Sequence, residues 1–404
     1  MGDHPPFKPS GRSAIAPFIV MEMMAAANAR AANGAEVLHL EVGEPGGGTP
    51  PAAVKAAMVA LTDGACGYTE AFGLRTLRRA IATRYEVDHG VTVDPARIAM
   101  TAGASGGFIL AFIAAFDAGD RVIVTDPGYP AYRNILQALG IEVVSVPTDL
   151  STRFQPTPEL LDQVPGPIHG LVLASPSNPA GTMLSSADLA RLVAYCTRRG
   201  IRIVSDEIYH GITYDTPAET VLAFSSEAIV VNSFSKYYGM TGWRLGWLVL
   251  PPELVAPVTR LAQNLFISAP AIAQHAALGA MADAPDLVQR VEHYRRNRDR
   301  LLTMLPKAGL TRMAPAEGAF YLYVDISEFA ADSVQLCRRL LDETGVALTP
   351  GVDFDPGRGH RFVRLSFAGP EAEVATAAGR LCEWLRPTLP SQVGRRSALA
   401  PADL

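Results

Sequence analysis

The sequence predicts an α/β protein with a mostly parallel central sheet between helices in a large domain, followed by a smaller α+β domain. Five short apolar runs, rich in valine and isoleucine, each end abruptly in polar residues or in glycine and proline. The segments between them, such as 186–199, carry apolar residues at helical spacing. Short apolar strands are typical of a buried parallel sheet, and their alternation with helices indicates β/α units.

The predicted strands define where a ligand should bind. In chain order they cover residues 97–100, 121–124, 171–174, 201–204 and 228–231. In an open parallel sheet, ligands bind beyond the carboxyl ends of the strands. We therefore expect one crevice to collect the glycines and polar side chains that follow the runs, including Ser105, Tyr129, Asn178, Asp206, Ser233 and Lys236.

The pattern of predicted helices and strands changes after Pro285. A long charged helix is predicted over 286–305, strands over 320–324 and 362–367, and a helix over 333–343. We expect four parts: an N-terminal arm (1–44) that packs with the small domain, a large domain (45–285) that carries the crevice, the small domain (286–390) and a mobile tail (391–404).

Composition excludes several classes of protein. A chain of 404 residues with 49% hydrophobic and 19% charged residues is typical of a globular enzyme. A net charge of -5 without basic runs argues against nucleic acid as a partner. The four scattered cysteines lack the spacing of a metal site or disulfide framework. The start resembles no signal peptide and the longest apolar stretch, 108–116, is too short to span a membrane, so we expect a cytoplasmic protein.

Lys236 has the surroundings of a reactive lysine. It is one of only four lysines, and apolar runs flank its segment at 228–231 and 245–250. Because desolvation disfavours the ammonium form, more of this amine is a free base that can attack a carbonyl. Lys236 is therefore a candidate to form a Schiff base.

The segment 233–244, SFSKYYGMTGWR, carries the first part of a family resemblance. Over about residues 15–386 the chain resembles a class I/II aminotransferase of the fold-type-I superfamily that depends on pyridoxal 5'-phosphate. The resemblance implies that Lys236 bonds the cofactor aldehyde as an internal aldimine, while Ser233 and Arg244 hold the phosphate.

Two further segments match the family's ring-binding residues. In 205–209, SDEIY, the resemblance places the Asp206 carboxylate against the pyridine nitrogen, where it favours the protonated, electron-withdrawing ring. Tyr209, together with Asn178 of the Asn-Pro-Ala-Gly match, would hydrogen-bond the phenolic oxygen of the ring. The implied catalytic residues are Lys236, Asp206 and Tyr209.

The remaining cofactor contacts follow from three more matches. Gly103, Ala104 and Ser105, before an apparent helix, are similar to the family's phosphate cup. Tyr129 occupies the position whose ring stacks on the pyridine. Tyr68 matches the tyrosine that reaches the cofactor phosphate of the neighbouring subunit, which implies a homodimer with shared active sites.

The substrate contacts implied by the resemblance are Arg364, Asn178 and Gly43. Arg364, in the strand-like 362–367, matches the arginine that grips the substrate α-carboxylate, a task suited to a bidentate guanidinium. Gly43 resembles a substrate-side glycine of the N-terminal segment. The sequence then departs from the family, because Gly46-Gly47-Gly48 stands where an acidic and an aromatic residue are common.

The predicted activity is transfer of the amino group of an L-amino acid to a 2-oxo acid by a ping-pong mechanism. An elimination or decarboxylation on the same scaffold is the alternative. A serine hydrolase is a remote alternative, because 103–107 fits G-x-S-x-G and could be combined with Asp353 and His360. A regulatory protein built on a transaminase fold would carry an added DNA-binding domain. We expect none here, because this chain reaches the family's N-terminal arm within about twenty residues. The substrate side chain is not determined, since Phe18, Ile19, Tyr68, Phe266 and Phe354 fit either a pocket or the core.

Overall fold

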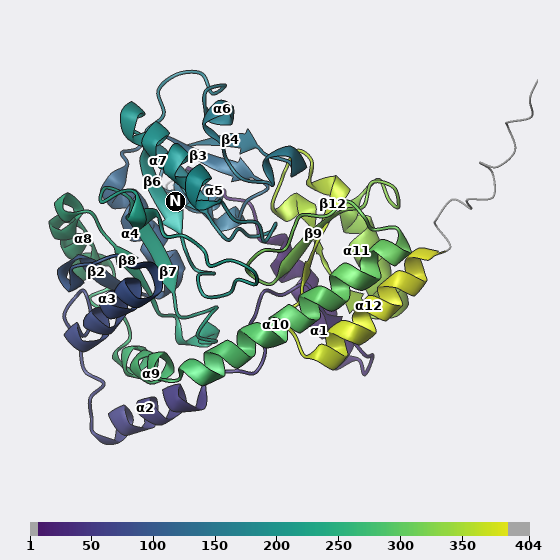
Figure 1. Ribbon diagram of the computed structural model, residues 1–404, viewed down its shortest axis with the longest axis horizontal. Helices are drawn as coiled ribbons and strands as arrows, with labels where there is room; N and C mark the ends of the chain where they lie inside the picture. Colours follow the sequence, from purple (N-terminus) through teal and green to yellow (C-terminus); the bar gives the residue numbers. More distant parts are fainter. Residues whose placement is uncertain (1–6, 387–404) are drawn as a thin grey trace, which may run out of the picture.

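The computed structural model describes residues 7–386, so the predicted tail at 391–404 lies outside the described residues. A seven-stranded sheet has the order β2-β8-β7-β6-β5-β3-β4 (Figure 1). Its strands are β2 (Ile98–Thr101), β3 (Arg121–Asp126), β4 (Glu142–Pro147), β5 (Gly170–Ala174), β6 (Arg202–Asp206), β7 (Ile229–Ser233) and β8 (Gly246–Val249). Only β8 runs antiparallel to its neighbours within this sheet, which confirms the predicted α/β class with a mostly parallel sheet.

Helices cover both faces of the sheet. Along β3, Ile123 belongs to one apolar cluster while Val122 and Val124 belong to another, as alternation along a doubly covered strand requires. The helices of this body are α2 (Pro51–Thr62), α3 (Arg75–His89), α4 (Gly103–Ala115), α5 (Pro130–Ala138), α6 (Pro158–Leu161), α7 (Ser186–Arg199), α8 (Pro252–Leu265) and α9 (Ala271–Ala282).

Helix boundaries follow local capping chemistry. The Ser185 side chain accepts a hydrogen bond from the Asp188 amide at the start of α7, and Gly200 ends that helix in the left-handed conformation. Asp332 and Gly345 do the same for α11 (Ser333–Thr344). Over residues 7–386, no helix is both long enough and apolar enough to cross a membrane.

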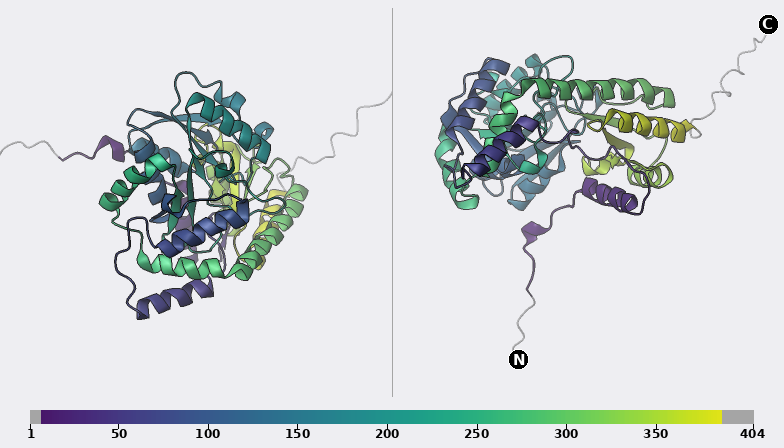
Figure 2. Two further views of the ribbon diagram at one scale, coloured as in Figure 1. Left: turned by 60° about the vertical axis from the view of Figure 1, so that its left-hand side comes forward. Right: turned by 90° about the horizontal axis from the view of Figure 1, so that it is seen from below.

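A second hydrophobic core lies at the other end of α10 (Ala284–Met304), the long helix that links the two bodies in Figures 1 and 2. It contains the three-stranded antiparallel sheet β11-β12-β9 and the strand pair β1-β10. Its elements are β9 (Tyr321–Asp325), α11, β10 (Val346–Ala347), β11 (Thr349–Pro350), β12 (Phe362–Ser366) and α12 (Glu371–Leu385), joined by α1 (Ile19–Ala32) and β1 (Leu38–His39) from the N-terminal arm.

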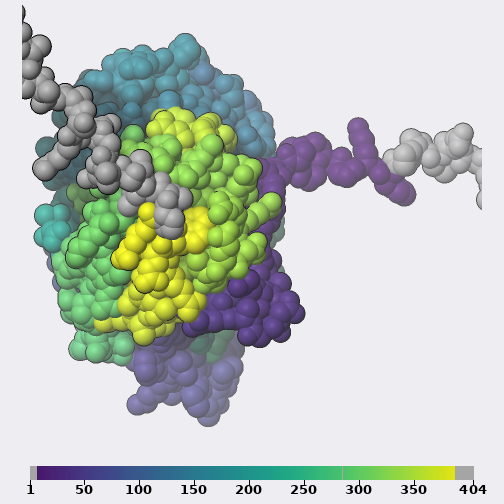
Figure 3. Space-filling model, turned by 90° about the vertical axis from the view of Figure 1, so that its right-hand side faces the viewer, coloured from purple at the N-terminus to yellow at the C-terminus, as the bar shows by residue number. Residues whose placement is uncertain are grey.

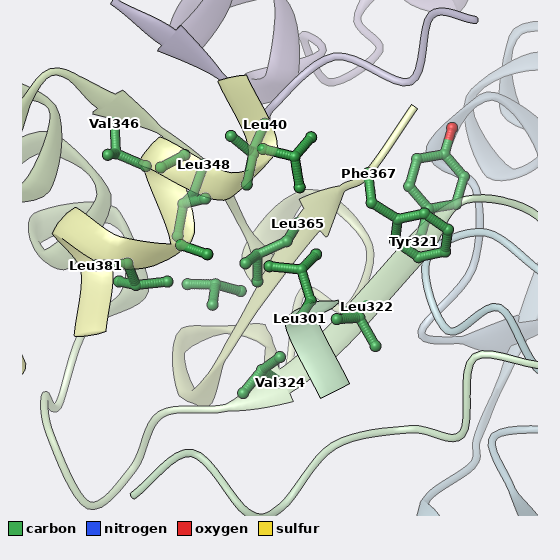
Figure 4. Close-up of a cluster of buried hydrophobic side chains, with 14 of the residues drawn as sticks. Leu40, Leu301, Tyr321, Leu322, Val324, Val346, Leu348, Leu365, Phe367 and Leu381 are labelled. Atoms are coloured by element: carbon green, nitrogen blue, oxygen red, sulfur yellow. The ribbon is translucent and has the colours of Figure 1, made fainter. Parts of the chain in front are cut away.

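The N-terminal arm is part of this second core. Figure 4 shows Leu40 beside Leu348 and Leu365, and Met23 and Ala27 of α1 belong to the same buried cluster. The surface view in Figure 3 shows the purple arm against the yellow-green C-terminal elements. The arm thus packs against β10, β12 and α12, which come from the other end of the described chain.

Candidate active site

A cavity of about 270 Å³ lies where the arm, the carboxyl ends of the central strands and the β9-β12 sheet meet. Most of the residues predicted from the sequence line it: Gly43, Ala104, Ser105, Tyr129, Asn178, Asp206, Tyr209, Lys236, Arg244 and Arg364. These positions span more than 300 residues of sequence, so the structure brings the predicted crevice together.

Lys236 lies three residues beyond β7, and its Nζ donates a hydrogen bond to the Gly43 carbonyl oxygen at 2.7 Å. Burial, helped by the positive field of Arg364, lowers the pKa of this amine to about 8, against opposing contributions from Glu44 and Asp206. Near neutral pH a larger share of this amine is therefore the free base than at the ordinary pKa of a lysine. The site thus supplies a nucleophilic amine near neutral pH.

Asp206 is the last residue of β6, which aims its carboxylate into the cavity. Tyr132 donates a hydrogen bond to one carboxylate oxygen, and the Ile208 amide donates to the other at 3.0 Å. Burial raises the pKa of Asp206 to about 6, opposed chiefly by the Tyr132 hydrogen bond. Each oxygen keeps a second lone pair, so the carboxylate can still accept a proton donor from the cavity.

One end of the cavity is built to receive an anion. Helix α4 begins at Gly103 without a side-chain cap, so its first amides remain free. The Arg244 guanidinium packs against Gly103, where an added Cβ would lie 2.5 Å from Nη2. Arg244 itself adopts a left-handed backbone conformation (φ 50°), an uncommon geometry that cradles the helix start. A helix N-terminus beside a guanidinium favours a phosphate.

The two serines before Lys236 take different positions. Ser235 lines the cavity, whereas Ser233 is buried beneath it and its hydroxyl donates to the Leu245 carbonyl at 3.0 Å. The Ser235 amide donates to the Ser233 oxygen, also at 3.0 Å. Ser233 therefore shapes the turn that carries Lys236, and Ser235 is the one of these two serines that lines the cavity.

Arg364 is a buried cation held in a fixed orientation. Nη1 donates to Asn178 Oδ1 at 3.0 Å, and Nη2 donates to the Glu41 carbonyl at 2.5 Å and to Thr349 Oγ1 at 3.3 Å. Its Nε has no hydrogen-bond partner, and no carboxylate of residues 7–386 pairs with it. An unpaired buried cation is costly unless an anion arrives, so this position is suited to a carboxylate ligand.

Aromatic side chains complete the walls. The Tyr209 hydroxyl lies 2.9 Å from that of Tyr321, and burial raises the pKa of Tyr209 well above its ordinary value. Tyr129 packs edge-on against Tyr132, with ring centroids 5.3 Å apart. Because Asn178 Oδ1 already accepts from Arg364, its amide nitrogen is the group left to donate.

Two predicted features lie away from the cavity. Tyr68 is 85% exposed in the loop between α2 and α3, and it does not reach the cavity of its own chain. The three glycines at 46–48 form a turn held by Arg290, which donates to the Gly48 carbonyl at 2.7 Å. None of the three glycines is among the residues that line the cavity.

Sequence reasoning missed Tyr132, Tyr321 and Ser235. Tyr132 lies inside α5 and Tyr321 at the start of β9, where an aromatic residue has the pattern of ordinary core. The only available signal was that Ser235 precedes the lysine directly.

The hydrolase alternative finds no support in the geometry. Ser105 lines the cavity, but neither Asp353 nor His360 does. The Asp353 carboxylate instead accepts hydrogen bonds from the Ile19 and Val20 amides at 3.1 and 3.2 Å, and His360 is exposed. These residues do not form a catalytic triad.

Comparison with known proteins agrees with this geometry. The family described as aminotransferase class I and II matches residues 35–381. A valine--pyruvate aminotransferase of Mycobacterium tuberculosis is 46% identical over 380 residues, which cover 93% of this chain and 97% of that protein. An aspartate aminotransferase of Thermotoga maritima is 33% identical, with 90% and 96% covered.

Solved structures show the same fold. The crystal structure of an aminotransferase from M. tuberculosis has a TM-score of 0.93 and 44% identity, covering 95% of this chain and all of the other. The aspartate aminotransferase from Thermus thermophilus with maleate has a TM-score of 0.88 and 32% identity, covering 93% and 99%. The predicted resemblance, fold and type of enzyme are thereby confirmed. This chain belongs to the class I and II aminotransferase family and is an aminotransferase.

Proposed function

We propose that the protein transfers the amino group of an L-amino acid to a 2-oxo acid in two half-reactions, with pyridoxal 5'-phosphate held at Lys236. The observation that carries this proposal is the juxtaposition, in one cavity, of a buried lysine of lowered pKa with two arginines that have no carboxylate partner within the described part of the chain. One arginine adjoins a helix N-terminus, and the other lies in the β9-β12 sheet.

The residues present fit this cofactor. Its phosphate requires an anion site, which the first amides of α4 and Arg244 offer, with Ala104 and Ser105 beside them. Its pyridine nitrogen requires an acid, and Asp206 retains lone pairs toward the cavity. Its phenolic oxygen requires donors, which the Tyr209 hydroxyl and the Asn178 amide supply.

When bound, the cofactor supplies the electron sink that lets the proton on the substrate α-carbon leave. Arg364 would bind the α-carboxylate and so determine which bond of the substrate α-carbon is oriented for cleavage against the cofactor ring. The Lys236 amine would take that proton from the α-carbon and return it to the carbon on the far side of the substrate nitrogen, a role that its lowered pKa permits near neutral pH. Tyr129 provides an aromatic face against the ring.

The proposal is tested by separating the half-reactions. Holoenzyme mixed with an amino acid alone should release one equivalent of 2-oxo acid per site and then stop, because the amino group stays on the enzyme. Addition of a second 2-oxo acid should restart turnover. Continuous release of ammonia without an acceptor would indicate a lyase instead and would contradict the proposal.

Arg364→Ala should raise the KM for the amino acid about 100-fold, since two hydrogen bonds to a charged group are lost. Arg364→Lys keeps the charge without the planar fork, so it should recover only part of the affinity. Steady-state kinetics of both variants, alongside their thermal unfolding, provide the measurement. An unchanged KM in a folded Arg364→Ala protein would remove this residue from the substrate site.

We also propose a homodimer, from an exposed apolar stripe near Tyr68. Helix α2 packs on α9 at one edge of the molecule (Figure 1), and its Val54, Met58 and Leu61 are 41%, 63% and 61% exposed. These side chains recur at helical spacing on one face. A contiguous exposed apolar face of this kind is typical of a subunit interface. Tyr68 lies in the loop six residues beyond the end of α2 and would then extend toward the second subunit.

Met58→Glu should convert a dimer into monomers, because burying an unpaired carboxylate at an interface is strongly unfavourable. Sedimentation velocity at micromolar concentration measures the change. Val87→Glu on α3 is the matched control, since Val87 is also exposed but lies outside this stripe. A wild-type protein that sediments as a monomer would contradict the interface.

A further inference from the structure

Among residues 7–386 of one chain, the lining of the cavity leaves no charged group for the substrate side chain. The charged residues among its lining are Asp206, Lys236, Arg244 and Arg364. In the proposed function, Arg364 binds the α-carboxylate and Arg244 the phosphate, while Asp206 and Lys236 serve the ring and the reacting carbon. A second carboxylate or an amine on the substrate would therefore enter without a partner, at a substantial desolvation cost.

One side of the cavity, here called the open side because Met21 on it is largely exposed, is apolar and comes from α1 and the residue before it. Val20, Met21 and Met24 of α1, with Phe18 immediately before it, line this side. Met21 is 54% exposed, so its thioether side chain is available to cover a ligand. Methionine adapts its shape to irregular apolar partners. The Phe18 ring packs edge-on against Tyr129, with centroids 5.8 Å apart, which joins this wall to the cofactor site.

Asp353, which lies more than 300 residues from α1 in the sequence, holds the start of this helix. The residue before α1, Phe18, offers no side-chain cap, and the Ile19 and Val20 amides donate instead to the two oxygens of Asp353. The next residue, Phe354, packs against the Arg364 guanidinium at 4.8 Å from the ring centroid. The start of α1 is thus tied to the residue that holds the substrate carboxylate.

We propose that the first turns of α1, positioned by Asp353, form the side-chain subsite and select an uncharged aliphatic amino acid of medium length. This inference rests on the proposed function, because it assigns Arg364 and Arg244 as above. Phe18, Val20, Met21 and Met24 determine specificity, and Asp353 is a positioning residue that does not touch the substrate.

The first experiment compares amino donors in single half-reactions. With wild-type holoenzyme, kcat/KM for leucine or methionine should exceed that for aspartate, glutamate or lysine at least 100-fold, because the charged side chains lack a partner. Equal activity with aspartate would overturn the inference, for example by revealing a cation supplied by a second subunit, and would leave the proposed function intact. No reaction with any amino acid would contradict the proposed function itself.

The second experiment changes the wall. Met21→Arg places a cation at the open side and should raise kcat/KM for glutamate at least tenfold while lowering that for leucine. Ala26→Arg is the matched control, because Ala26 is exposed on the same helix, about 140° around its axis, and does not line the cavity. If both variants change the glutamate-to-leucine ratio equally, α1 does not contact the side chain.

The third experiment separates positioning from general stability. Asp353→Asn keeps one carbonyl acceptor and loses the other, so α1 should be held less firmly. The KM for leucine should rise about fivefold, whereas the KM for alanine, whose side chain is too short to reach α1, should stay within twofold. A merely structural role would move both values together, and that result would reject Asp353 as a positioning residue.

Discussion

Replacing Lys236 with alanine should lower turnover about 10⁴-fold, because the variant loses the group that both accepts and returns the substrate proton. The variant should still bind the cofactor noncovalently, since the anion site at Gly103 and Arg244 is untouched. Borohydride treatment followed by peptide mass spectrometry should label Lys236 of the wild type and leave the variant unlabelled.

Lys307→Ala is the control for this experiment, because Lys307 is exposed and does not line the cavity. It should retain full turnover and the label at Lys236. A Lys236→Ala protein with near wild-type turnover, or a label on another lysine, would end the assignment of Lys236 as the proton carrier.

Asp206→Asn should lower kcat about 10²–10³-fold, which is the usual cost of removing one preorganised electrostatic group from an active site. Asparagine has nearly the same shape and can still accept from Tyr132, but it carries no charge to hold a proton on the ring nitrogen. Single-turnover kinetics measure the effect on the proton-transfer step directly.

Tyr132→Phe provides the comparison for Asp206. It removes a neighbour that donates to the carboxylate and leaves the charge in place, so its loss of rate should be much smaller than that of Asp206→Asn. Equal losses in the two variants would mean that the charge of Asp206 is not what the reaction uses.

The sequence alone predicted the location of strands wherever these strands were short and uniformly apolar. The predicted run 171–174 became β5, and the predicted helix 333–343 became α11. β4 was missed because most of its residues are exposed or only partly buried, and its apolar and polar residues do not alternate clearly. The antiparallel direction of β8 could not be read from an apolar run, since strand direction is set by the connection and not by composition.

Site residues were predictable where the chain itself places a polar group after a strand. Asp206 ends β6 and Asn178 follows β5, so their convergence follows from sheet topology. Tyr321 and the Asp353 contact with α1 were not predictable in this way. Both depend on how the second core packs against the arm, across more than 300 residues in the case of Asp353.

The contacts of Arg364 impose an order on biosynthesis. Its guanidinium is held by the Glu41 carbonyl, Asn178 and Thr349, which come from the beginning, the middle and the end of the polypeptide. A nascent chain that has emerged only as far as β8 contains Gly103 and Arg244 of the anion site but still lacks Thr349 and Arg364. Such a chain cannot bind the carboxylate of an amino acid through Arg364, so recognition of the amino acid appears only when translation is nearly complete.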